Sequence, residues 1–226
     1  MQLGVCYRPN QFGVSLDNNR SATMETLNIR EAVLLAIAVV IALTAHESAH
    51  AWVAARLGDN TATRNGRVTI NPLKHIDPFG TVVLPLALII AHSPFIFGYA
   101  KPVPVNWKAL RKPKRDMALV AAAGPAANLA LGFVLTGFLA LIHITVNEKT
   151  GWIMEALAIA TATNFVLAFF NMIPIPPLDG SKVFSSFLPE RLANPYLRLG
   201  RYGFLPLLAA LVILPLLALG LGALFR

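Results

Sequence analysis

Long apolar stretches dominate this sequence and limit its possible folds more than any other feature. Of its 226 residues, 56% are hydrophobic and only 13% are charged, whereas about a quarter of the residues in a water-soluble domain are charged. An α-helix needs about 20 consecutive apolar residues to cross the hydrocarbon core of a bilayer. Five stretches come close to or exceed that length: residues 29–57, 79–98, 117–146, 152–173 and 204–225. The sequence therefore predicts an all-α polytopic membrane protein with about four to five transmembrane helices.

The stretch 79–98 fits a transmembrane helix less well than the other four. It is short, and Pro85 interrupts it. The connection before it, residues 58–78, contains a β-branched alternation between Thr61 and Ile70 that favours a short strand or hairpin. We therefore expect a short β-like or re-entrant element between the first helix and the third apolar stretch. Whether residues 79–98 cross the membrane stays open at this point.

Basic residues gather in the polar connections between the apolar stretches. The chain has 19 Lys and Arg against 11 Asp and Glu, a net charge of +8. A nucleic-acid-binding domain would place such residues on one water-facing surface. Here they flank apolar stretches, where they direct membrane topology and bind anionic lipid headgroups. The pattern excludes nucleic acid as a partner and indicates a lipid bilayer. The one cysteine, Cys6, excludes a Cys-based zinc site.

Two histidines and a glutamate lie together in the first apolar stretch, in the sequence His46-Glu47-Ser48-Ala49-His50. Residues four apart share one face of a helix, so the two histidines can bind the same metal ion. Glu47 lies beside them and can act as a general base on a metal-bound water. Ionisable residues inside a membrane helix are costly and therefore indicate a function. The motif predicts a zinc site and metal-assisted hydrolysis.

A catalytic zinc ion takes a third protein ligand and keeps one coordination position open. Asp179 is the strongest candidate, because it follows the fourth apolar stretch and three prolines there can direct its carboxylate back toward the helices. On the residues alone, however, a helix cap or an Asp-Gly turn explains Asp179 better than metal binding does. His75 and Asp77 are further candidates, although a turn before the stretch 79–98 accounts for them better.

Three motifs together resemble the site-2 protease family of intramembrane zinc metalloproteases. They are HESAH at residues 46–50, GPAAN at residues 124–128, and NMIP with LDG between residues 171 and 180. The resemblance implies that His46, His50 and Asp179 bind one Zn²⁺ ion and that Glu47 is the catalytic base. It also implies transmembrane protein substrates, cleaved within the bilayer in regulated intramembrane proteolysis. Because no PDZ-like insertion separates the motifs, the chain looks like the compact branch of the family.

The length and composition of the chain imply a simple domain organisation. Residues 29–226 are expected to form a single membrane-embedded metalloprotease domain. Residues 1–28 read as a polar N-terminal leader, since they lack the apolar core of a signal peptide. The sequence does not indicate the oligomeric state.

The three expected ligands constrain how the chain threads through the membrane. The histidines lie near the end of the first helix, and Asp179 lies just after the end of the fourth apolar stretch. The ligands can meet only if these two helices run in the same direction, which requires that residues 79–98 do not cross. Most of the Lys and Arg then fall on one side of the membrane, which the positive-inside rule identifies as cytoplasmic. We expect an active site nearer the cytoplasmic face of the plasma membrane of a prokaryotic cell.

Two asparagines are candidates for contacts with the substrate or with the developing oxyanion. An amide in apolar surroundings needs a partner, which Asn171 and Asn128 could find in the substrate. Hydrogen bonds between helices explain both residues equally well. The competing functions are a membrane metal-binding or transport protein and an inactive scaffold of the same fold. A transporter would gain nothing from a glutamate between the two histidines.

Overall fold

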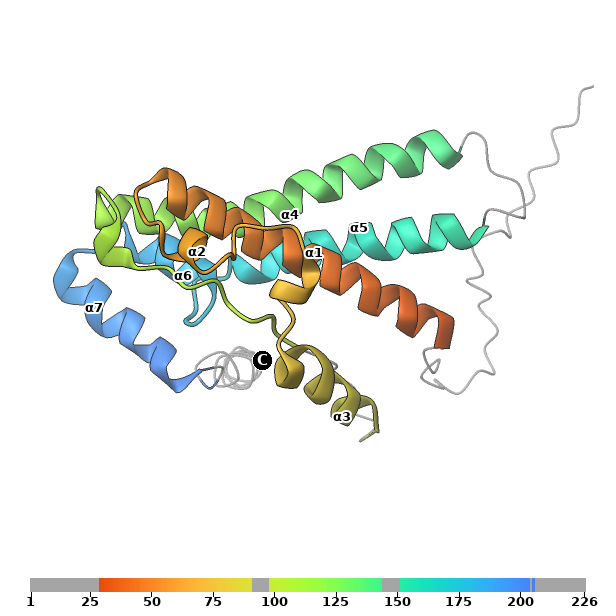
Figure 1. The fold of residues 1–226 in the computed structure, drawn as a ribbon, viewed down its shortest axis with the longest axis horizontal. Helices are drawn as coiled ribbons and strands as arrows, with labels where there is room; N and C mark the ends of the chain where they lie inside the picture. The colour runs from red at the N-terminus through yellow and green to blue at the C-terminus, as the bar shows by residue number, and fades with distance from the viewer. Residues whose placement is uncertain (1–28, 91–97, 144–150, 204, 206–226) are drawn as a thin grey trace, which may run out of the picture.

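A computed structural model of the chain describes residues 29–90, 98–143, 151–203 and 205. The described part is mostly helical (Figure 1). Its α-helices are α1 (Ile29–Arg56), α2 (Thr61–Arg64), α3 (Leu84–Ile90), α4 (Pro113–His143), α5 (Gly151–Asn171), α6 (Asp179–Ser185) and α7 (Glu190–Arg198). Short helical turns of other types are η1 (Pro72–Lys74), η2 (Pro78–Val83), η3 (Trp107–Ala109) and η5 (Leu199–Tyr202). The expected leader and most of the fifth apolar stretch lie outside the described residues.

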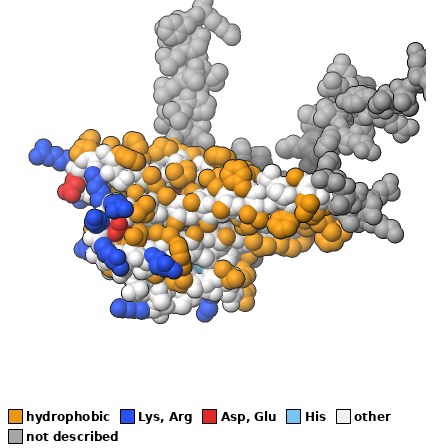
Figure 2. Space-filling view, turned by 90° about the horizontal axis from the view of Figure 1, so that it is seen from above, with side chains coloured by type: hydrophobic (Ala, Val, Ile, Leu, Met, Phe, Trp, Pro, Cys, Tyr) orange, Lys and Arg blue, Asp and Glu red, His pale blue; other side chains and the backbone are white. Residues whose placement is uncertain are grey.

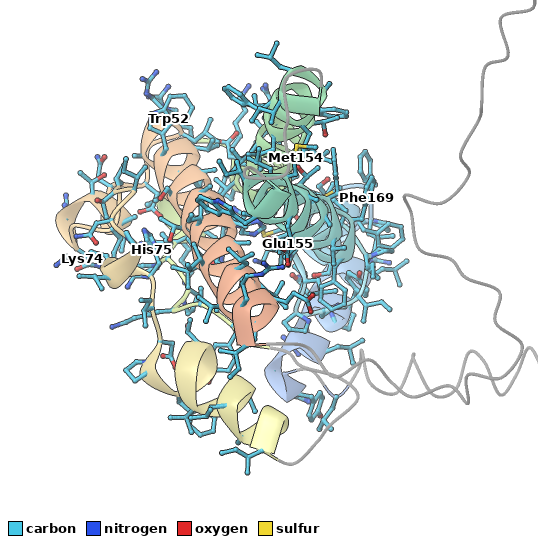
Figure 3. All side chains as sticks on the ribbon, turned by 90° about the vertical axis from the view of Figure 1, so that its right-hand side faces the viewer. Trp52, Lys74, His75, Met154, Glu155 and Phe169 are labelled. Carbon is cyan, nitrogen blue, oxygen red and sulfur yellow. The ribbon has the colours of Figure 1, made fainter. Side chains whose placement is uncertain are left out.

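The helices α1, α4 and α5 form the body of the molecule and pack against one another in every pairing. These three are long and apolar enough to cross a membrane. Their facing sides carry small residues such as Ala42, Ala121 and Ala168, which are at most 1% exposed and let the backbones approach closely. Large apolar side chains point outward instead, as Trp52 and Phe169 do in Figure 3. Apolar side chains accordingly cover the flank of the bundle in Figure 2, while Lys and Arg gather at one end.

The direction of the three long helices agrees with the topology expected from the ligands. In Figure 1, α1 and α5 run in the same direction and α4 runs between their ends in the opposite direction. The end of α1, the start of α4 and the end of α5 therefore lie at the same end of the bundle. The intervening residues 57–112 leave this end and return to it.

The second apolar stretch begins and ends at one place. The Tyr99 N–H donates to the Gly80 carbonyl over 3.1 Å, and the Thr81 hydroxyl donates to the Tyr99 carbonyl over 2.8 Å. Gly80 allows this approach, because a Cβ there would lie 2.3 Å from the Tyr99 ring. The stretch starts as η2 and α3, and the described residues at its two ends, Gly80 and Thr81 on one side and Tyr99 on the other, lie side by side. Its residues 91–97 lie outside the described part of the chain.

The strand expected between Thr61 and Ile70 is not found: residues 61–64 form α2, and the described residues contain no β-strand. The physical reason is local hydrogen bonding. Asp59 accepts the Thr61 N–H at the start of α2. The Thr69 carbonyl accepts from the Ser48 hydroxyl and from His75 Nε2. A β-branched alternation forms a strand only where a neighbouring strand can pair with it, and here side chains satisfy the backbone instead.

Candidate metal centre

His46 and His50 lie one turn apart near the end of α1, on the face that packs against α4. Both are buried, with 4% and 8% of their surface exposed. Their Nε2 atoms lie 3.0 and 3.1 Å from the same atom, Oδ2 of Asp179. The structure thus brings together the three residues that the sequence singled out as ligand candidates.

The second ring nitrogen of each histidine is held by a neighbouring helix. His46 Nδ1 donates to Oδ1 of Asn128 over 2.6 Å, and His50 Nδ1 donates to the Val120 carbonyl over 2.6 Å. With the proton on Nδ1, the lone pair of each Nε2 faces Asp179. Such outer hydrogen bonds fix the tautomer and the ring orientation of metal-binding histidines.

Asn128, from the GPAAN motif on α4, is fully buried and all its hydrogen-bond partners belong to the protein. Its amide nitrogen donates to the Ala42 carbonyl on α1 and to Oδ1 of Asn164 on α5. Asn164 in turn donates to the Ala160 carbonyl. Asn128 therefore ties the three long helices together behind His46. Sequence reasoning missed Asn164, whose signal was an amide inside an apolar helix.

Asp179 begins α6, after a turn that brings the chain back from the end of α5. Gly180 packs directly on the backbone of Met172, and a Cβ at this position would clash with it. The second carboxylate oxygen, Oδ1, accepts from Lys182 Nζ over 2.9 Å. Burial alone would raise the pKa of Asp179, but its contacts with the two histidine rings and the charge of Lys182 hold it well below its usual range. Asp179 is therefore an anion whose two oxygens have separate partners.

Gly124 explains how α4 can pass so close to the histidines. A Cβ at this position would lie 2.5 Å from Nε2 of His46 and of His50. Only glycine leaves that space free. The glycine that begins the GPAAN motif is thus needed because any larger side chain would collide with the two histidine rings.

The donor set fits a zinc ion. His46, His50 and Asp179 each offer one ligand atom, and these atoms lie within 4.8 Å of one another. Two imidazole nitrogens and a carboxylate oxygen are a usual protein ligand set for catalytic zinc. Among the described residues no other group of three His, Cys, Asp or Glu side chains converges in this way.

The other candidate residues form hydrogen bonds with groups outside the set of three ligand atoms. Glu47 is half-buried, and its Oε2 accepts from the backbone N–H of Val103 over 2.8 Å. Asn171 is half-buried at the end of α5, where its amide donates to the Leu167 carbonyl. His75 and Asp77 are not part of the centre. His75 packs in the loop before η2, and Asp77 accepts from the N–H groups of Phe79 and Gly80.

A buried pair of histidines four residues apart on an apolar helix, a neighbouring glutamate and a converging aspartate are the residue types typical of a membrane-embedded zinc metalloprotease. The comparison with known proteins agrees. The chain belongs to peptidase family M50, the site-2 protease family, whose model matches residues 137–214. A relative in Bacillus subtilis (strain 168), named "Putative zinc metalloprotease YwhC", is 38% identical over 182 residues, which cover 79% of this chain and 80% of that protein.

Mycobacterial relatives are more distant. "Putative zinc metalloprotease Rip2" of Mycolicibacterium smegmatis is 29% identical over 82% of this chain and 68% of its own length. The Mycobacterium tuberculosis protein of that name is 31% identical over 62% of this chain and 52% of its own length. No solved structure matches the chain. The chain is therefore an integral membrane protein of a zinc metalloprotease family.

Proposed function

We propose that this protein is an intramembrane metalloendopeptidase that hydrolyses peptide bonds of transmembrane protein substrates. In this proposal His46, His50 and Asp179 bind one Zn²⁺ ion, and Glu47 is the general base. The observation that carries it is the convergence of both Nε2 atoms on Asp179 Oδ2, with Glu47 on the next position of the same helix. These residues lie on or directly beside helices that are apolar enough to cross a membrane, which supports the proposal that the substrates lie in the bilayer.

The residues divide the chemistry among themselves. When bound, zinc supplies a Lewis acid that activates water and polarises the scissile carbonyl. Glu47 accepts a proton from the attacking water and delivers it to the leaving amine nitrogen. Lys182 holds Oδ1 of Asp179, which leaves Oδ2 for the metal.

The two asparagines take different parts in this proposal. Asn128 orients His46, because its amide oxygen and nitrogen are already bonded to protein groups and it is 0% exposed. It therefore has no polar atom left for a substrate. Asn171 is half-buried at the end of α5, so it remains the candidate for holding the substrate strand or the oxyanion.

Replacement of Glu47 by Gln tests the proposed reaction. The variant should keep one zinc ion per chain and lose cleavage of a transmembrane substrate, because Gln cannot accept the proton. Zinc content by elemental analysis and cleavage in detergent or proteoliposomes measure the two properties. A metal transporter would keep metal flux in this variant, and an inactive scaffold would show no cleavage in the wild type. Cleavage by a purified Glu47→Gln protein would disprove the mechanism.

We further propose that the basic end of the bundle, where α1 ends and α4 begins, faces the cytoplasm of a prokaryotic cell. Single-cysteine labelling tests this orientation in a Cys6→Ser background, which removes the one native cysteine. Arg111→Cys should react with a membrane-impermeant maleimide only after permeabilisation. Gly151→Cys, at the opposite end of the bundle, should react in intact cells. The reverse pattern would overturn the orientation.

A further inference from the structure

The segment of residues 100–106, here named the strap, lies in extended conformation beside Glu47. It connects the second apolar stretch to η3. Its central residue, Val103, donates its backbone N–H to Oε2 of Glu47 over 2.8 Å. The other carboxylate oxygen, Oε1, accepts no hydrogen bond from the described residues. One oxygen of the proposed base is thus held, and the other remains for proton transfer.

Two prolines make Val103 the one backbone donor in the middle of the strap. Pro102 and Pro104 have no N–H and restrict the backbone to a narrow range of φ. The residues before them are driven toward extended conformations. Between Lys101 and Val105, therefore, the chain presents a single N–H in a stiff frame, and that N–H meets Glu47.

Buried polar groups anchor the first half of the strap. The Lys101 N–H donates to the His75 carbonyl over 2.9 Å. The guanidinium of Arg67, a residue only 7% exposed, donates to the carbonyl of Lys101 over 2.6 Å and reaches the Pro102 carbonyl. Figure 3 shows the loop that carries His75 beside α1, with Lys74 pointing away from the helices.

Asp59 anchors the far end. Its Oδ2 accepts the Asn106 N–H over 2.6 Å, and the residue is 0% exposed. The Val103 side chain packs between these anchors, against Ala51 of α1 and Ala62 of α2. A displaceable lid would have weak, exposed attachments, whereas this segment is fixed on both sides by buried charged groups.

We propose that the strap is a positioning element for Glu47 and that the Val103 N–H fixes the carboxylate for catalysis. This inference rests on the proposed function, in which Glu47 is the base. A glutamate side chain has three rotatable bonds, so holding one oxygen removes most of its freedom. A base held at the right place accelerates proton transfer, since small misplacements of catalytic groups cost large factors in rate.

Amide hydrogen exchange of the full-length, zinc-loaded protein tests the contact without any measurement of activity. Because Pro102 and Pro104 have no amide hydrogen, the Val103 amide can be resolved from its neighbours by fragment mass spectrometry. It should exchange far more slowly than in an unstructured peptide. Glu47→Ala, which removes the acceptor, should release this protection and leave that of Lys101 unchanged. Glu47→Gln, which retains an acceptor oxygen, should preserve both.

A Val103 amide that exchanges at the unstructured rate in the wild type would overturn the proposal, whatever the variants do. The same holds if Glu47→Ala folds, as judged by Lys101 protection, and leaves Val103 protected. These outcomes do not depend on cleavage. A wild-type protein that binds zinc and cleaves nothing would instead refute the proposed function.

Kinetics separate positioning from packing. Val103→Pro removes the N–H and retains the extended backbone, and Val103→Ala trims the side chain and keeps the N–H. We expect kcat of Val103→Pro to be about tenfold or more below that of Val103→Ala, with similar KM and zinc content. Equal kcat values would show that the N–H has no catalytic role. A higher kcat for Val103→Pro would show that the strap acts as a lid that must leave Glu47 during the reaction.

Discussion

The metal centre and the strap both contact α1, yet they are built in different ways. The centre consists of side chains on regular helices: the histidines on α1, Asn128 on α4 and Asp179 at the start of α6. The strap consists of backbone groups of an irregular segment, held by Arg67, Asp59 and the His75 carbonyl. Helices position the groups that bind metal, and a proline-stiffened segment positions the group that moves a proton.

This difference predicts two kinds of defect. Changes at the centre should remove zinc and activity together, since the same side chains support both. Changes at the strap should reduce turnover while zinc stays bound, because no strap residue belongs to the donor set. Substitutions that mix the two effects would break the distinction.

Removal of a proposed metal ligand should have the largest effect. Asp179→Ala takes away the carboxylate on which both histidines converge, so zinc content should fall to near zero and cleavage should vanish. Elemental analysis of the purified protein and a cleavage assay measure this. Glu155→Gln is the control, because that carboxylate pairs with Arg30 in the first turn of α1, whereas the histidines lie near the other end of that helix. Full zinc content in Asp179→Ala would remove Asp179 from the ligand set.

A methyl group at Gly124 should disturb the centre without removing any donor. The Cβ of Gly124→Ala would lie 2.5 Å from both Nε2 atoms, so α4 or the histidines must shift. A displacement of about 1 Å can cost about 10²-fold in rate, and we expect a loss of that order together with weaker zinc binding. Gly137→Ala is the matched control on the same helix, because nothing lies within 4 Å of its Cβ. Equal activity of both variants would contradict the close packing.

Asn128→Ala should weaken zinc binding by about 10- to 100-fold, the usual cost of losing an outer hydrogen bond to a metal-binding histidine. The variant leaves His46 Nδ1 without its partner and also frees Asn164. Competition with a fluorescent zinc chelator measures the affinity. Thr136→Val on α4 removes a polar group that bonds only to its own helix, and it should bind zinc normally. A loss of cleavage with unchanged zinc affinity would return Asn128 to the role of a substrate contact.

The contrast between side chains on regular helices and backbone groups of an irregular segment also explains which features could be predicted from the sequence. The apolar stretches, the spacing of His46 and His50 and the need for Asp179 to reach them depend on helix geometry, which repeats every 3.6 residues and can be read from one chain. The parallel direction of α1 and α5 followed from that need. Whether these residues perform the proposed roles stays a prediction for the zinc and cleavage measurements.

The region between α1 and α4 could not be predicted in the same way. The alternation between Thr61 and Ile70 favoured a strand, but its backbone groups are bonded to Asp59, Ser48 and His75. Hydrogen bonds between side chains and backbone groups follow no sequence period, so the prediction of a strand was wrong there. The pairing of Val103 with Glu47 was missed for the same reason. The one sequence signal for it was the spacing of Pro102 and Pro104.

The smallest expected effect concerns the anchor of the strap and its dependence on pH. Burial alone would raise the pKa of Asp59, but N–H donors from Thr61 and Asn106 and the charge of Arg64 lower it below the usual value. A lowered pKa in the folded state means that the ionised group stabilises the fold above its unfolded pKa of about 4. This contribution is lost as the pH falls through the folded value. At neutral pH, Asp59→Asn should therefore reduce the free energy of unfolding by about 1–2 kcal/mol.

The difference between the wild type and Asp59→Asn should shrink steadily as the pH is lowered below about 4, where the unfolded carboxyl takes up its proton. Thermal unfolding of both proteins in the same detergent across this range measures the difference, and any loss of zinc at low pH affects both alike. If the strap depends on this anchor, the Val103 amide of Asp59→Asn should also exchange faster at neutral pH while zinc content is unchanged. A pH-independent difference would mean that Asp59 stabilises the fold by packing rather than by its charge, and the strap would then rest on Arg67 and the His75 carbonyl.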